Sequence, residues 1–145
     1  MGLETIYWGG AYLGVLAYLN TQVPVNGAVF VTPRGCISLL DVYAKGGMLR
    51  EDLVFLGPGK PARARLTSGG PGSRSLTMRD LARADVVVFQ AAESEFDNIS
   101  RTLYERGEPD FVLDLEGVPL LLAFKREEVR KPFPLPAPQA AERIR

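Results

Sequence analysis

The chain has 145 residues, 46% hydrophobic and 23% charged, a mixture that suits one globular domain and excludes wholesale disorder. Seventeen basic and seventeen acidic residues cancel, so the chain lacks the net positive charge typical of nucleic-acid-binding domains. There is no histidine and only one cysteine, Cys36, which excludes Ser-His-Asp and Cys-His triads, zinc fingers, CxxC pairs and an intrachain disulfide.

The neutral total conceals three stretches of unlike charge. Residues 1–84 hold nine basic and five acidic side chains, residues 85–116 hold two and nine, and residues 117–145 hold six and three. These are either ordinary solvated faces of one domain, or a positive patch of one protomer that meets a negative patch of the next. In the second interpretation Arg63 and Arg65, within the basic stretch, are interface residues.

The first element is expected in residues 5–33, which contain no charged side chain. Their most apolar part, residues 6–19, is shorter than the roughly 20 residues of a membrane-spanning helix. It has neither a basic leading region nor a small-x-small cleavage pattern, so we expect no secretory signal and a location in the cytoplasm or in a virion. The segment is either a buried helix or strand of the core, or an apolar surface covered by a partner subunit. Tyr7, Trp8 and Tyr12 are candidate interface residues because aromatic side chains favour such surfaces.

The middle of the chain reads as short strands separated by turn residues. Thr-Pro-Arg-Gly, Gly-Gly and Gly-Pro-Gly runs separate apolar segments, as expected between strands. The predicted elements are strands over residues 27–31, 36–43 and 53–56, a strand with one charged face over residues 62–66, and a Gly/Ser/Pro loop over residues 68–75.

The second half combines helices with the most apolar strand. Two capping-box patterns, Thr77 with Asp80 and Ser94 with Asp97, predict helix starts. Gly107 is a natural helix end. The predicted elements are helices over residues 78–84 and from Ser94 to Gly107, a strand over residues 85–90 buried on both faces, and a hairpin of residues 111–115 and 119–124. The predicted fold is α+β, a mostly antiparallel sheet with two helices in a single globular domain over residues 1–131.

The last segment, residues 132–145, is predicted to be an extended arm. Proline stands at every second position from Pro132 to Pro138, which forbids a helix and favours a polyproline II conformation. The composition fits a disordered tail, or an arm that docks on its own body or on a neighbouring chain. Phe133 and Leu135 alternate with the prolines and are the candidate anchors.

One stretch has a catalytic pattern. Pro109-Asp110 precedes the hairpin and Lys125 ends it. This stretch resembles the core of the PD-(D/E)xK nucleases, in which an Asp on one hairpin strand and an acid-x-Lys on the next hold Mg²⁺. The resemblance implies that Asp110 is a metal ligand and Lys125 the lysine. The second acidic position is Ala123, and without that carboxylate the metal loses a ligand. An inactive relative of these nucleases, or a plain glycine-centred hairpin, accounts for the pattern.

Together these observations favour assembly over chemistry. We expect a non-enzymatic structural protein, a subunit of a homo-oligomer or of a larger particle such as a bacteriophage capsid decoration or tail protein. Its partners would be copies of itself and another structural protein, with no cofactor, metal or membrane. The alternative is a nucleic-acid-associated or regulatory binding protein, including an inactive PD-(D/E)xK-like domain. An enzyme that uses carboxylate chemistry is a third class, for which no local pattern singles out residues.

Overall fold

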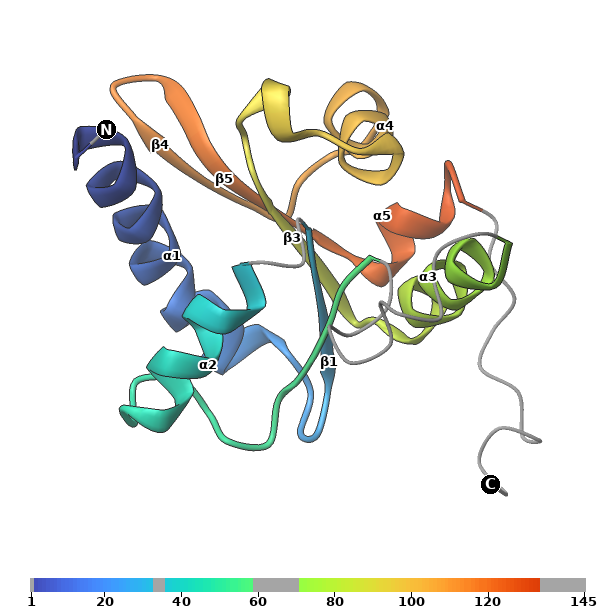
Figure 1. The fold of residues 1–145 in the computed structure, drawn as a ribbon, viewed down its shortest axis with the longest axis horizontal. Coiled ribbons are helices and arrows are strands. Elements are labelled where there is room, and N and C mark those ends of the chain that lie inside the picture. Colours follow the sequence, from blue (N-terminus) through green and yellow to red (C-terminus); the bar gives the residue numbers. More distant parts are fainter. Residues whose placement is uncertain (1, 33–35, 59–70, 134–145) are drawn as a thin grey trace.

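The computed structural model describes residues 2–32, 36–58 and 71–133, with side chains from residue 11 onward except in residues 71–76 and 95 (Figure 1). The predicted strand over residues 62–66 lies outside the described residues, as do Arg63, Arg65 and Leu135. The described part combines helices with a mixed sheet, which confirms the α+β class.

A five-stranded sheet forms the centre of the molecule, with strand order β2-β1-β3-β5-β4. Strand β1 runs parallel to both β2 and β3, whereas β5 runs antiparallel to both β3 and β4. The expectation of a mostly antiparallel sheet is therefore wrong, because three of the five strands are parallel neighbours. The strands are β1 (Ala28–Thr32), β2 (Val54–Leu56), β3 (Val86–Gln90), β4 (Phe111–Leu115) and β5 (Val118–Lys125).

The described residues form five α-helices, so the expectation of two helices is also wrong. A short 3-10 helix, η3 (Glu93–Glu95), follows β3. The α-helices are α1 (Gly2–Gln22), α2 (Ile37–Lys45), α3 (Pro71–Arg83), α4 (Asn98–Arg106) and α5 (Arg126–Arg130).

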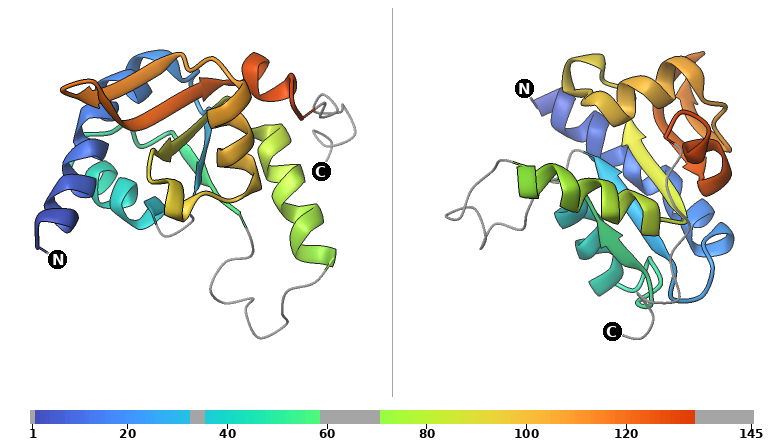
Figure 2. Two further views of the ribbon diagram at one scale, coloured as in Figure 1. Left: turned by 90° about the horizontal axis from the view of Figure 1, so that it is seen from above. Right: turned by 90° about the vertical axis from the view of Figure 1, so that its right-hand side faces the viewer.

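The helices cover both faces of the sheet, α1 and α2 on one face and α3, α4 and α5 on the other (Figures 1 and 2). Each face has its own apolar core, because the central strands β1 and β3 are buried on both sides. Burial on both faces is what the continuous apolar runs of these strands predict. The expected strand over residues 85–90 is confirmed as β3.

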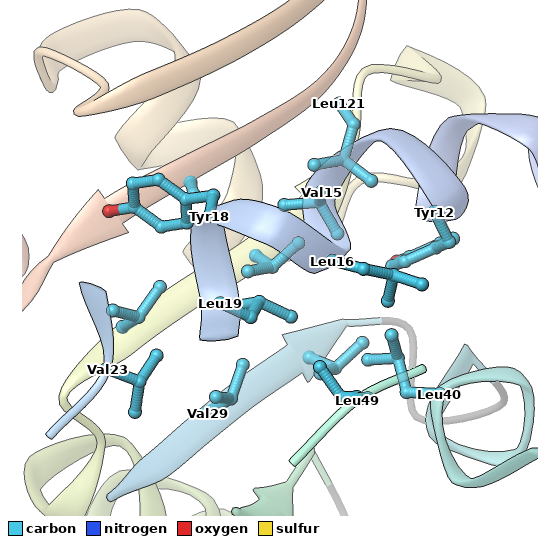
Figure 3. Close-up of a cluster of buried hydrophobic side chains, with 14 of the residues drawn as sticks. Tyr12, Val15, Leu16, Tyr18, Leu19, Val23, Val29, Leu40, Leu49 and Leu121 are labelled. Atoms are coloured by element: carbon cyan, nitrogen blue, oxygen red, sulfur yellow. The ribbon is translucent and has the colours of Figure 1, made fainter. Parts of the chain in front are cut away.

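Helix α1 supplies much of the first core. Tyr12, Val15, Leu16 and Leu19 recur at helical spacing and are all at most 5% exposed. Figure 3 shows them packed against side chains of β1, α2 and β5, among them Leu121. Six of residues 11–19 in the uncharged segment are therefore buried in the core of their own chain, as the first of the two alternatives predicts.

Aromatic rings organise the second core. Phe89 of β3 stacks on Phe124 of β5 with ring centroids 5.5 Å apart, and Phe96 meets Phe89 edge-on at 5.6 Å. Leu81 of α3 and Leu103 of α4 complete the cluster from the helix layer.

The segment predicted as a strand over residues 36–43 is a helix, α2. Parallel neighbours β1 and β2 need a crossover connection, and α2 lies in that connection. The burial in the structure fits a helix: Leu40 is fully buried, whereas Val42, two residues further on, is 62% exposed.

Two helix starts also differ from expectation. Helix α3 begins at Pro71, so the expected loop of residues 68–75 is wrong for residues 71–75, and Thr77 and Asp80 lie inside the helix. Proline is favoured at a first helical position because its missing N–H has no partner there anyway. Helix α4 begins at Asn98, and its capping box joins Asp97 to Ser100, where Ser94 was expected to form the cap.

Strands β4 and β5 form the predicted hairpin, which is confirmed. Its two-residue turn is Glu116-Gly117, with φ of 51° and 84°. Positive φ at both positions defines the type I′ turn that suits the twist of paired strands.

Polar clasps hold the element ends in place. Arg50 donates hydrogen bonds to the carbonyls of Asn20, Val23 and Pro24 at the end of α1, and Asp52 accepts from the same guanidinium. These contacts satisfy carbonyls that a helix end leaves without partners.

A second clasp joins the starts of β1 and β3. The carboxylate of Asp85 accepts from the Ala28 amide at 2.9 Å and pairs with Arg126 at 3.0 Å. Arg126 also donates to the carbonyl of Ala84, so the start of α5 is tied to the same point.

Candidate functional site

The two residues that carry the nuclease resemblance are neighbours in the structure. The Asp110 carboxylate lies 3.6 Å from Lys125 Nζ and accepts a hydrogen bond of 2.7 Å from the Tyr18 hydroxyl. Ala123, at the position of the missing acid, is fully buried in the first core. The geometry therefore brings Asp110 and Lys125 together as a structural tie between the hairpin and α1.

Tyr18 joins α1 to this pair of residues, because it donates to Asp110 and packs on Phe111. Its ring lies 5.0 Å from that of Phe111, and burial, followed by the hydrogen bond to Asp110, raises the pKa of the hydroxyl well above its ordinary value. The hydroxyl is accordingly a donor to Asp110 over the whole physiological pH range. Sequence reasoning missed Tyr18 as the partner of Asp110, since the two residues are 92 positions apart.

The β4–β5 hairpin forms an open edge of the sheet. Among the described residues β4 pairs only with β5, and its other side has no strand beside it. Three apolar side chains of the hairpin are exposed: Val112 at 43%, Leu115 at 51% and Val118 at 57%. We call these three residues the hairpin edge. An edge strand with exposed apolar side chains is a template for pairing with another chain. In β4 this edge is short, and its pairing with β5 shifts register between Leu113 and Asp114.

Helix α1 lies directly beside the hairpin edge. A Cβ built on Gly14 would lie 2.6 Å from a methyl group of Leu113, so the glycine permits the close approach of α1 to β4. The next residue toward the N-terminus, Leu13, is 47% exposed.

The surroundings of the hairpin edge are acidic. Residues 105–116 contain five acidic side chains and one basic side chain, Arg106. Asp110 is balanced by Lys125, and the Asp114 carboxylate accepts from the Gly117 amide within the turn. Neither contact removes the excess of negative charge along this edge.

A pocket of about 350 Å³ lies between α3 and the start of α4. It adjoins the carboxyl ends of the parallel strands, where open sheets with helices on both faces commonly bind ligands. Pro58, the second residue after β2, borders it together with α3 and the start of α4. The lining residues are Pro58, Thr77, Met78, Asp97, Asn98, Ile99 and Phe133.

The predicted interface residues lie in different places. Tyr12 is fully buried in the first core, whereas Phe133 is half-buried, packs on the second core and lines the pocket. Tyr7 and Trp8 belong to α1, and their side chains lie outside the part that is described. Of the predicted interface residues whose side chains are described, Tyr12 therefore belongs to the first core and Phe133 packs on the second.

The described part has neither a cluster of metal-ligating side chains nor a helix that could span a membrane. Its Cys, Asp and Glu side chains form no group of three or more that could hold a metal ion. None of the helices within it combines the length and hydropathy needed to cross a bilayer.

Comparison with known proteins adds no relationship: no family model, no curated protein and no solved structure matches the chain.

Proposed function

We propose that the chain is a non-enzymatic assembly subunit that binds a second copy of itself at the hairpin edge. The observation that carries the proposal is the open β4 strand with Val112, Leu115 and Val118 exposed beside it. Fully burying an exposed side chain of this kind contributes about 1.5–3 kcal/mol, and because these three are already about half-buried, about half of that remains for each. The outward backbone groups of β4 add the hydrogen bonds of one further strand.

Charge decides which surface of the second copy meets this edge. If two β4 strands paired antiparallel around Val112, Asp110 of each copy would face Asp114 of the other. Like charges directly opposite each other destabilise such a pair. The complementary surface is therefore a basic one, and the basic excess of the sequence lies in residues 1–84, where Arg63 and Arg65 alternate with alanine.

An acidic edge that meets a basic segment makes a head-to-tail contact. Contacts of this type continue from copy to copy and close into rings or extend into filaments. This arrangement suits a subunit of a larger particle. More specifically, we propose that the particle is a virion.

The proposal is tested by the mass of the protein in solution, measured by light scattering and sedimentation over a range of concentrations. We expect the wild type to form oligomers and Val112→Lys to shift the equilibrium to monomers. Val54→Lys is the matched control, because Val54 lies on the opposite edge strand β2 and is 42% exposed, against 43% for Val112. Monomeric wild-type protein at all concentrations, or dissociation by Val54→Lys alone, contradicts the proposal.

A charge reversal tests the basic partner surface separately. The double change Arg63→Glu with Arg65→Glu should weaken the oligomer, and raised salt should weaken the wild type in the same direction. Adding Glu116→Lys at the hairpin turn should restore part of the association. If the double change leaves the mass unaltered, another surface of the second copy makes the contact.

A further inference from the structure

We propose that the pocket between α3, α4 and Phe133 binds a small organic cation with an apolar ring or chain. The site is separate from the hairpin edge and does not depend on assembly. Four of its lining residues are apolar: Pro58, Met78, Ile99 and Phe133. Ile99 is buried and the other three are half-buried, so they offer a ligand an apolar wall that is reachable from solvent.

The pocket has the size of a small-molecule site. Its volume of about 350 Å³ lies at the lower end of the range for ligand pockets, roughly 300–1,000 Å³. This size suits one ring with a short substituent. The Phe133 ring and the flexible Met78 side chain are both able to pack on such a ring.

Asp97 supplies the charge that selects the ligand. Its Oδ2 accepts a hydrogen bond of 2.6 Å from the Thr32 hydroxyl, and its Oδ1 accepts from the amide and hydroxyl of Ser100 at 2.9 Å. A carboxylate has about four acceptor positions, so one remains open. None of the ion pairs found in the described part involves Asp97.

The sign of the charge in the pocket follows from comparing two contributions. Asp97 caps α4, whose N-terminus carries the equivalent of about half a positive charge. The full negative charge of the carboxylate exceeds it, and Asp97 is the one charged residue among the lining residues described. A ligand that places its ammonium group beside Asp97 and its apolar ring or chain against Met78 and Phe133 matches both the charge and the apolar wall of the pocket.

The test uses two probes with the same phenylethyl part: 2-phenylethylamine carries a charged ammonium group, and 2-phenylethanol carries a neutral hydroxyl group. Binding is followed by NMR through the methyl groups of Met78 and Ile99, titrated on the full chain. We expect saturable shifts with the amine and at least about fivefold weaker binding of the alcohol, as for a charge-assisted contact at a partly exposed site. Methyl groups of Val42, on the other face, should not shift.

The variant Asp97→Asn isolates the charge. Asparagine is as good an N-cap as aspartate, so α4 keeps its start while the pocket loses its charge. We expect the amine to bind this variant about as weakly as the alcohol binds the wild type, with alcohol binding unchanged. Phe133→Ala should weaken both probes. Absence of saturable shifts, equal affinity for the two probes, or an unaltered amine affinity in Asp97→Asn overturns the proposal. Oligomer mass is a separate measurement, so failure of this site and failure of the assembly proposal are distinguishable.

Discussion

The Thr32 hydroxyl donates a 2.6 Å hydrogen bond to Oδ2 of Asp97, a residue 65 positions further along the chain. Thr32 ends β1 and is 2% exposed, and Asp97 caps α4. One carboxylate thus fixes the start of a helix, the end of a central strand and the wall of the pocket. Because Thr32 is shielded from water, its hydroxyl relies on the Asp97 carboxylate as its hydrogen-bond acceptor within the described part of the chain.

Removing the hydroxyl alone measures the worth of that contact. Thr32→Val keeps the shape of the side chain, and we expect a loss of about 1 kcal/mol in the free energy of unfolding. Thr32→Ser keeps the hydroxyl and loses a methyl group, so it should retain the hydrogen bond. Urea unfolding of both variants checks the prediction, which fails if Thr32→Val is as stable as the wild type.

Removing the carboxylate should cost more. Asp97→Ala deletes the N-cap, worth about 0.5–2 kcal/mol, and also leaves the buried Thr32 hydroxyl without its acceptor. In the double variant with Thr32→Val the orphaned hydroxyl is gone. We therefore expect the two losses to be less than additive, which a double-mutant cycle by urea unfolding measures.

Acid should weaken the clasp at the end of α1. The hydrogen bond from Arg50, followed by that from the Asn26 amide, holds the pKa of Asp52 well below its ordinary value. A carboxylate with a lowered folded-state pKa stabilises the fold above its unfolded pKa of about 3.9, and this contribution is lost as the pH falls below that value. Wild-type stability should therefore fall more steeply than that of Asp52→Asn between about pH 4 and pH 2. Circular dichroism during acid titration checks the slopes, and parallel curves would contradict the assignment.

Alkali should weaken the tie between α1 and the hairpin. Burial and the hydrogen bond to Asp110 raise the pKa of Tyr18, so its neutral form is favoured in the folded chain. This contribution is complete below the unfolded pKa of about 10 and is lost as the pH rises above it. Tyr18→Phe should cost about 1 kcal/mol at neutral pH and flatten the decline above about pH 10. Urea unfolding at a series of pH values compares the two proteins.

Two glycines that end helices should respond differently to alanine. A Cβ on Gly107 would lie 2.9 Å from the Leu103 carbonyl oxygen and from a ring atom of Phe124, whereas one on Gly46 would lie 3.4 Å from its nearest neighbour. Both have ordinary negative φ, so crowding alone separates them. We expect Gly107→Ala to cost about 1–3 kcal/mol. Gly46→Ala should leave the melting temperature nearly unaltered, and equal losses would refute the crowding argument.

The elements that could be predicted from the sequence are those whose pattern is local. The continuous apolar run of β3 shows burial on both faces, and the β4–β5 hairpin shows its turn in Glu116-Gly117. Both signals depend on residues adjacent in the chain. The position of Ile99 and Leu103 on the buried side of α4 likewise follows from their helical spacing.

The remaining elements depend on long-range pairing. Residues 36–43 read as a strand because they are apolar and partly β-branched, and only the parallel pairing of β1 with β2 requires a helix there. The polar contacts described above also join residues that are far apart in the sequence. Thr32 is marked in the sequence only as a polar residue that ends an apolar strand, and nothing near it points to Asp97. Asp110 and Lys125 could be singled out, but their partner Tyr18 could not.

Strand β1 is buried along its whole length, so its side chains do not alternate between core and solvent. Such a strand has no in-and-out pattern with which to reject a shifted alignment. Its two ends supply what the pattern lacks: Asp85 receives the Ala28 amide at one end, and Asp97 receives the Thr32 hydroxyl at the other. A slip of one residue moves both donors by about 3.3 Å and breaks both contacts at once. The carboxylates of Asp85 and Asp97 thus fix the register of the central strand β1 in the sheet.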